Sequence, residues 1–280
     1  MKRNILSEVK GFETTDGAGV RLTRVLSRRS SEMFDPILML DSFDSKDPKD
    51  YIAGFPMHPH RGIETITYVY NGNMIHKDSL GNQDAITDGE LQWMTAGSGI
   101  LHSEEIPASE RMLGVQLWLN LPAKDKMVAP EYHAIKNKDI EEIKIDGGKL
   151  RLLAGKYKDK KAYKSKYLPL NYYDIHLAPN KSFNIETEKD SSVLLFTLVG
   201  EALINGKHIG EKTAVKLAEG DEVLVSSTDK DLQLLFIESR YLGEEIAWGG
   251  PIVMNTKEEL DKAFEELENG SFIKDEMKYE

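Results

Sequence analysis

Glycine-containing turns divide residues 55–104 into short segments that have the composition of β-strands. Residues 65–70 form a β-branched and aromatic run, and Asn71-Gly72 directly after it is a strong hairpin signal. Further turn dipeptides stand at Gly81-Asn82 and Asp88-Gly89. Strands of about five to seven residues at this spacing are typical of an antiparallel barrel or jelly roll. The pattern therefore predicts an all-β fold.

Three of the seven histidines fall in two of these strand-like segments. One segment contains His58-Pro59-His60 and the other contains His102-Ser103-Glu104. Because a strand points alternate side chains to the same face, the outer residues of each triplet share a face. Neutral imidazole suits zinc, copper, iron and nickel, and a carboxylate can complete such a site. The best candidate ligands for one transition metal are therefore His58, His60, His102 and Glu104.

Spacing alone leaves the carboxylate ligand open. If residues 57–70 form one extended strand, Glu64 points the same way as the His58 pair and competes with Glu104 for that role. The glycine-rich residues 95–101 precede His102 and can bend the chain so that its imidazole points inward, since glycine allows positive φ. The other histidines have no partner at ligand spacing and are expected to have structural roles; they are His76, His133, His176 and His208.

The composition limits the chemistry and the partners. The chain has no cysteine, which excludes disulfides and thiolate ligands, so a metal must be held by nitrogen and oxygen. The N-terminal segment lacks an apolar signal core, and no run reaches the ~18 apolar residues of a membrane span, so we expect a cytoplasmic protein without membrane contact. The net charge of −11 argues against direct nucleic-acid binding. We interpret the lysine-rich residues 156–166 as a solvated loop, because they lack periodicity.

Residues 1–45 read as the entry strands of an N-terminal β domain. Residues 20–26 alternate in polarity after an Asp-Gly turn, and residues 36–40 form an apolar run suited to a core strand. Residues 41–51 are polar and contain Asp-Pro and Lys-Asp steps, so they are predicted to form a loop that leads to the first histidine strand.

The second half of the chain repeats the first in outline. Residues 196–202 parallel residues 67–72, and residues 219–223 parallel residues 88–91. Counting from the matching glycines places Glu186, Glu188 and Gln233 where the first half has His58, His60 and His102. Every histidine is lost, so the repeat predicts a second barrel without a transition metal. The predicted domains are a metal-binding barrel at residues 1–133, a second barrel at 134–250 and a helical tail at 251–280.

The end of the chain changes to a helical period. Thr256 and Glu259 form a capping-box pattern, and Asn269-Gly270 is a stop signal. Four apolar residues fall on one helical face, namely Leu260, Ala263, Phe264 and Leu267. We expect this short C-terminal helix to dock its apolar face on one of the barrels.

These residues carry a resemblance to a known superfamily. The pattern Gly54, His58-x-His60, Glu64 and Gly72, followed by Gly89 and Gly99-x-x-His102, resembles the two motifs of the cupins. The fuller strings at residues 58–65, 91–104 and 250–255 more narrowly resemble the pirin family. Pirins are bicupins, so the resemblance implies two cupin-type antiparallel β-barrels with iron in the N-terminal one only. It also implies that Glu104 is the fourth ligand and that Glu64 has a supporting or packing role.

The resemblance further implies an activity. Bacterial pirins are known as quercetin 2,3-dioxygenases, with Fe(II) as the metal and a flavonol and dioxygen as substrates. Four protein ligands on octahedral iron leave two positions for substrate oxygen and dioxygen. Glu104 is then the catalytic residue that deprotonates the flavonol 3-hydroxyl before the ring is opened with release of carbon monoxide. Trp93, Met94 and Phe55 are candidates for an apolar pocket wall, with core packing as the simpler interpretation.

An alternative function comes from the eukaryotic pirins that the chain also resembles. These imply a non-catalytic, iron-binding and redox-sensing regulator that acts through a protein partner. Metal-dependent turnover of a flavonol under air separates the two hypotheses.

Overall fold

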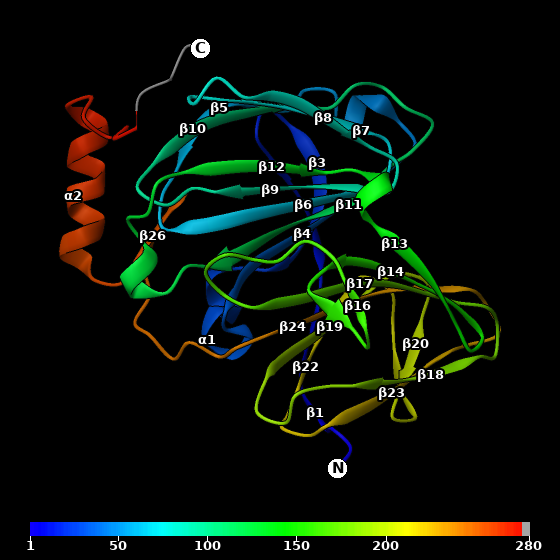
Figure 1. The fold of residues 1–280 in the computed structure, drawn as a ribbon. Helices are drawn as coiled ribbons and strands as arrows, with labels where there is room; N and C mark the ends of the chain where they lie inside the picture. The colour runs from blue at the N-terminus through cyan, green and yellow to red at the C-terminus, as the bar shows by residue number, and fades with distance from the viewer. Residues whose placement is uncertain (276–280) are drawn as a thin grey trace. The chain divides into compact units, whose positions relative to one another are not determined.

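The computed structural model describes residues 1–275, which form two compact β units (Figure 1). Unit 1 comprises Met1–Phe12, Val25–Pro36 and Asn137–Tyr241. Unit 2 comprises Glu13–Arg24, Ile37–Lys136 and the C-terminal residues from Leu242. The units are therefore discontinuous in sequence, whereas the predicted domains 1–133, 134–250 and 251–280 are contiguous. Those sequence boundaries stay a prediction.

Unit 2 consists of two antiparallel sheets. The larger has seven strands in the order β12-β9-β6-β11-β4-β3-β2, and the smaller has four in the order β5-β10-β7-β8. Their bounds are β2 Phe12–Asp16, β3 Val20–Leu26, β4 Ile37–Ser45, β5 Phe55–His60, β6 Ile63–Asn71, β7 Asn73–Asp78, β8 Gln83–Thr87, β9 Glu90–Thr95, β10 Ile100–Glu105, β11 Met112–Asn120 and β12 Glu131–Ile135. The apolar clusters buried in this unit include one around Tyr51 and Met74 and another around Met94 and Trp118.

Unit 1 has the same pair of sheets. Its larger sheet has the order β1-β22-β19-β24-β17-β14-β13 and its smaller one the order β18-β23-β20-β21. Their bounds are β1 Ile5–Lys10, β13 Glu141–Ile145, β14 Gly148–Ala154, β17 Leu170–Leu177, β18 Ser182–Glu186, β19 Ser192–Val199, β20 Ala202–Ile204, β21 Lys207–Ile209, β22 Thr213–Leu217, β23 Glu222–Ser227 and β24 Leu232–Ser239. An apolar cluster is buried in this unit, with Leu195, Val225 and Phe236 among its members.

The shorter elements lie in turns and connections. They are η1 Arg28–Ser30, α1 Ser31–Phe34, η2 Pro48–Asp50, η3 Ala123–Asp125, η4 Asn137–Asp139, the hairpin β15 Lys156–Tyr157 with β16 Lys160–Lys161, the hairpin β25 Ala247–Gly249 with β26 Ile252–Met254, and α2 Lys257–Glu268.

The matching strand orders confirm the predicted bicupin architecture and correct one step of the predicted repeat. In the two small sheets, β18 takes the place of β5 and β23 takes the place of β10. Gln233 lies on β24 of the large sheet, which corresponds to β11, so the counting rule that matched it to His102 was wrong. The glycine before β23 is Gly220, and it corresponds to Gly99 before β10 rather than to Gly89. The count failed because it assumed equal strand and turn lengths in the two halves.

Part of the predicted loop at residues 41–51 is strand. The strand predicted at residues 20–26 is confirmed as β3, but the next strand, β4, continues through Ser45. Two arginines stabilise its acidic end, since Arg24 binds Asp41 through two nitrogens and Arg111 binds Asp44 in the same way. These cross-strand ion pairs allow a polar sequence to remain extended, and local composition does not reveal them.

The C-terminal helix α2 is confirmed, and it packs within unit 2. Both hydrogen bonds of the Thr256–Glu259 capping box are present. Its apolar face packs with strand β26 in a cluster that includes Ala263 and Phe272. The buried Arg61 ties this region to the turn after β5, because its guanidinium donates to Glu266 and to the Phe272 carbonyl. Within residues 1–275 no helix has the length and apolar character needed to cross a membrane.

Candidate metal centre

Strands β5 and β10 are neighbours in the small sheet of unit 2, and their register brings the predicted histidines together. His102 lies directly opposite His58, and His60 follows two residues later on the same face. One ring nitrogen from each of the three histidines falls within a group whose members all lie within 4.8 Å of one another. Among the described residues, this is the one such group of potential metal ligands.

Hydrogen bonds to backbone carbonyls set the tautomers of two of these imidazoles. His58 donates from Nδ1 to the Pro56 carbonyl at 2.8 Å, and His60 donates from Nδ1 to the Pro251 carbonyl at 2.9 Å. With Nδ1 as the donor, each Nε2 carries a lone pair, and the two Nε2 atoms are 3.1 Å apart. Two nitrogens bound at about 2.1 Å to one ion, at a right angle, lie ~3 Å apart. The pair therefore fits a shared metal ion.

His102 supplies the strongest test of this fit. Its side chain is 1% exposed, and neither ring nitrogen has a hydrogen-bond partner in the described part of the chain. A buried polar group without a partner is costly, and its usual explanation is a water or ion that satisfies it. Burial and the neighbouring imidazoles lower the pKa of His102 well below its ordinary value. Burial likewise lowers the pKa of His60 to about 3. Both rings are thus neutral at pH 7, as ligation requires.

Glu104 lies two residues beyond His102 on β10, and its carboxylate is completely buried. Gln116 donates from Nε2 to its Oε1 at 2.9 Å, and Gln92 donates to the same oxygen at 3.2 Å. Burial raises the pKa of Glu104 to about 7, although the bond from Gln116 works in the opposite direction. A divalent cation would favour the ionised form again. The two glutamines, which come from β11 and β9 of the large sheet, hold the carboxylate in one orientation.

Glu64 is separated from the histidines by a break in the strand. Strand β5 ends at His60 and β6 begins at Ile63, with Gly62 at φ +77° between them. A side chain at Gly62 would collide with the Val253 carbonyl, so the tight approach requires glycine. Glu64 Oε1 accepts from Trp93 Nε1 at 2.9 Å and from Thr95 Oγ1 at 2.7 Å. The premise of one extended strand over residues 57–70 is therefore wrong.

His76 and Asp78 lie beside the histidine group; a structural role was expected for His76, and Asp78 was not singled out from the sequence. On strand β7 they lie directly opposite Glu104 and His102. Both side chains are fully buried, His76 Nε2 is 2.9 Å from Asp78 Oδ2, and the His76 ring lies 5.4 Å from the His102 ring. Tyr132 stacks on His76 at 4.1 Å. The signal in the sequence was another i, i+2 pair, His76-x-Asp78, in the next strand-like segment.

The other predicted residues lie elsewhere. The remaining histidines are outside the cluster and face carboxylates, with His133 near Glu131, His176 near Asp174 and His208 near Glu201. Met94 belongs to the buried apolar cluster around Trp118, and Phe55 packs edge-on against Phe43 at 6.2 Å. With Trp93 bound to Glu64, the three proposed wall residues have packing or hydrogen-bonding roles.

The fold and this centre define a class. Two barrels of matching topology, one of which holds a buried cluster of imidazoles, are the architecture of a two-domain cupin. The pirin profile matches residues 19–119, and the profile of the pirin C-terminal cupin domain matches residues 172–273. The chain belongs to the pirin family.

Individual relatives agree with this assignment over nearly the full length. A pirin-like protein of Caulobacter vibrioides is 40% identical over 275 residues, covering 96% of this chain and 99% of that protein. Human pirin is 34% identical over 274 residues, covering 95% and 93%. A crystal structure of a quercetin 2,3-dioxygenase from Acinetobacter baumannii superposes with a TM-score of 0.89 at 33% identity, covering 97% of this chain and 99% of that one.

Proposed function

We propose that this chain is a metal-dependent dioxygenase that cleaves a flavonol in the manner of a quercetin 2,3-dioxygenase. The observation that carries the proposal is the convergence of three imidazoles, two of them buried and the third half-buried, on strands β5 and β10, with the buried Glu104 two residues beyond His102. Further support comes from the Acinetobacter structure, which is described as that enzyme and matches nearly all of this chain.

The proposed ligands are His58, His60, His102 and Glu104, with Fe(II) as the metal. The support for the three histidines is their grouping, the tautomers of two of them and the unpartnered nitrogens of the third. Glu104 is assigned by its position two residues after His102 on the same face of β10. When bound, the iron supplies the open coordination positions and the redox chemistry that an oxygenase needs.

Glu104 acts as the general base in this proposal. The buried carboxylate of Glu104 can accept the proton of a flavonol 3-hydroxyl and hold it close to the reacting centre. Gln92 and Gln116 position the carboxylate through Oε1, so the proton is accepted in a defined place. The apolar residues around the centre exclude water, which strengthens these electrostatic interactions.

The test is an aerobic assay with quercetin that follows both the loss of flavonol absorbance and the release of carbon monoxide. Iron-loaded protein should turn over, whereas apo protein and iron-loaded Glu104→Gln should not. Glu105→Gln is the matched control, because Glu105 is the next residue but is exposed and paired with Lys77. A flavone that lacks only the 3-hydroxyl should be a poor substrate, since its proton is the one that Glu104 removes.

Two results would contradict the proposal. Turnover that is unchanged in apo protein would mean that the metal of this barrel is not the catalyst. No turnover by reduced, fully iron-loaded protein would favour the alternative of a regulator that acts through a protein partner.

A further inference from the structure

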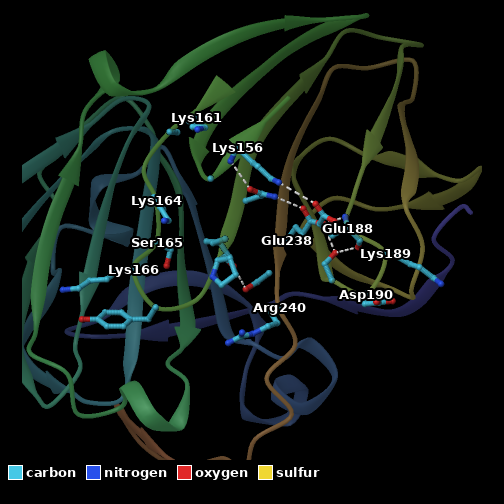
Figure 2. A pocket seen from close by; sticks show the side chains of 18 residues that line it. Lys156, Lys161, Lys164, Ser165, Lys166, Glu188, Lys189, Asp190, Glu238 and Arg240 are labelled. Carbon is cyan, nitrogen blue, oxygen red and sulfur yellow. Dashed lines mark hydrogen bonds and ion pairs between the residues drawn. The ribbon is translucent and has the colours of Figure 1, made fainter. Parts of the chain in front are cut away.

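Unit 1 contains a cavity of about 880 Å³ that is separate from the histidine centre in unit 2 (Figure 2). Its walls come from the β15–β16 hairpin, the segment at residues 162–171, the turn at residues 188–191 and the end of β24. The lysine-rich stretch at residues 156–166 therefore does more than form a solvated loop, because four of its lysines line this cavity.

The cavity wall is positively charged, although the whole chain carries a net charge of −11. Six basic side chains line it, namely Lys156, Lys161, Lys164, Lys166, Lys189 and Arg240. Three acidic side chains line it as well, namely Glu188, Asp190 and Glu238. A concave surface with this excess of cations concentrates the positive potential and attracts anions.

Two of the three acids are already engaged within the wall. Glu238 accepts hydrogen bonds from Asn171 Nδ2 at 2.8 Å, from Ser191 Oγ at 2.6 Å and from the Glu188 backbone N–H at 2.8 Å. The Glu188 carboxylate lies 3.7 Å from Lys156 Nζ. Both carboxylates are therefore bound by neighbouring groups of the wall, and Figure 2 shows these contacts as a network on one side of the cavity. The lysines at 161, 164 and 166 lie on another part of the wall.

Ser165 is a buried part of the same wall. It lines the cavity between two lysines, its side chain is 6% exposed, and its hydroxyl has no hydrogen-bond partner among residues 1–275. Because this hydroxyl is not accessible from the cavity, a ligand would contact the lysines on either side of it. Tyr167 and Pro169 add an apolar surface to the same wall.

We propose that this cavity binds a small phosphate ester that carries a ring, of the nucleoside phosphate class. Its volume falls in the range of small-molecule sites, about 300–1,000 Å³. Lysines are point charges that suit the several oxygens of a phosphate group, and Tyr167 offers a ring for the base to stack on. A nucleic acid fits less well, because a concave cavity in an acidic protein does not track an extended phosphate backbone. The site does not depend on the proposed oxygenase activity.

Isothermal titration calorimetry at low salt tests the proposal with adenosine 5′-diphosphate (ADP) as the probe. The full chain should bind ADP but not adenosine, and binding should weaken as salt is added. Lys164→Glu/Arg240→Glu should weaken ADP binding by roughly tenfold or more, since two favourable charges become repulsive. Lys144→Glu/Lys230→Glu is the matched control, because it makes the same charge change on exposed lysines outside the cavity wall and should leave binding within about twofold.

Tyr167→Leu is a second, charge-neutral variant. It should weaken ADP binding several-fold, because it removes the ring proposed to stack on the base, while circular dichroism and thermal unfolding show an intact fold. The proposal is overturned if wild-type protein does not bind ADP, or if the control pair weakens binding as much as the cavity pair. Equal affinity for inorganic phosphate would show that the cavity recognises a phosphate group alone, and would contradict the part of the proposal that concerns the ring. Binding of a short single-stranded oligonucleotide in preference to ADP would replace the proposal with a nucleic-acid site.

Discussion

The small sheets of the two units have the same strand order, but the side chains on their inner faces differ in polarity. In unit 2 this sheet carries buried or half-buried polar side chains, namely His58, His60, His76, Asp78, His102 and Glu104. The corresponding sheet in unit 1 carries apolar ones, namely Ile185, Ala202, Ile204, Val223 and Val225. One barrel topology is therefore compatible with both a metal centre and a continuous apolar core.

The difference shows what each barrel needs for stability. In unit 1 the apolar residues satisfy one another by contact, and burial alone stabilises the cluster. In unit 2 apolar clusters occur together with these buried polar residues, and some of the buried polar atoms lack a partner among residues 1–275. A bound metal would satisfy these atoms and stabilise the folded state by mass action. We therefore expect metal to affect unit 2 much more than unit 1.

The largest expected effect is the loss of metal from His58→Ala/His60→Ala. Wild-type protein should bind about one equivalent of transition metal, and this variant should bind almost none, because two of the three grouped imidazoles are gone. Elemental analysis of purified protein measures the ratio. His133→Ala/His208→Ala, on exposed histidines outside the group, should keep full metal content. Full metal content in the first variant would contradict the assignment.

The next effect separates the roles of Glu64 and Glu104, two buried glutamates of unit 2. Glu104→Gln should abolish flavonol turnover, a loss of about 10²-fold or more, because an amide neither accepts the proton nor ligates well. Glu64→Gln should keep turnover within about tenfold, since an amide oxygen can still accept from Trp93 and Thr95. Steady-state rates and metal content measure both. The reverse ranking would make Glu64 the ligand instead of Glu104.

Placing a histidine in the small sheet of unit 1, and a leucine in that of unit 2, tests how each inner face contributes to the free energy of unfolding. Val225→His should destabilise the protein by about 2–4 kcal/mol, because it buries an unpartnered imidazole in an apolar cluster. His102→Leu should stabilise apo protein by roughly 1 kcal/mol and lose the gain in stability that metal gives wild type. Urea unfolding with and without metal measures both. A destabilised apo His102→Leu would show that the site is satisfied without metal.

The last expected effect concerns the pH dependence of stability and one buried lysine in each unit. Burial lowers the pKa of Lys126 to about 7 and that of Lys216 to about 8, from the ordinary 10.5. Between the folded and unfolded pKa values the unfolded chain binds more protons, so stability rises with pH through that window. Lys126→Met should flatten the rise between pH 7 and 10.5, and Lys216→Met that between pH 8 and 10.5. Urea midpoints across pH measure the slopes; unchanged slopes would contradict the shifts.

Much of the metal centre could be predicted from residues that lie close together in sequence. The i, i+2 pairs at 58–60 and 102–104 share a face in any strand. Turns that contain glycine reverse the chain, so that one strand of a hairpin lies beside the next. The C-terminal helix could be predicted in the same way, from its capping box, the helical spacing of its apolar residues and the Asn-Gly pair after it. These signals are local, because they depend on backbone geometry that a few residues determine.

Pairing between distant strands supplied what the sequence analysis missed. His76 and Asp78 lie beside the histidine group because β7 pairs with β10, and the two glutamines reached Glu104 from the large sheet. The matching of β23 to β10 likewise followed from sheet order and not from counting residues.

The sequence by itself determined the all-β class, the resemblance to bicupins and the histidine positions that can face one another. Only the tertiary structure decided which strands pair, which polar atoms are buried without a partner, and that a lysine-rich stretch lines a cavity. The physical reason is that alternation and turn chemistry are properties of neighbouring residues. Burial, electrostatic environment and strand register depend instead on contacts between residues far apart in the chain.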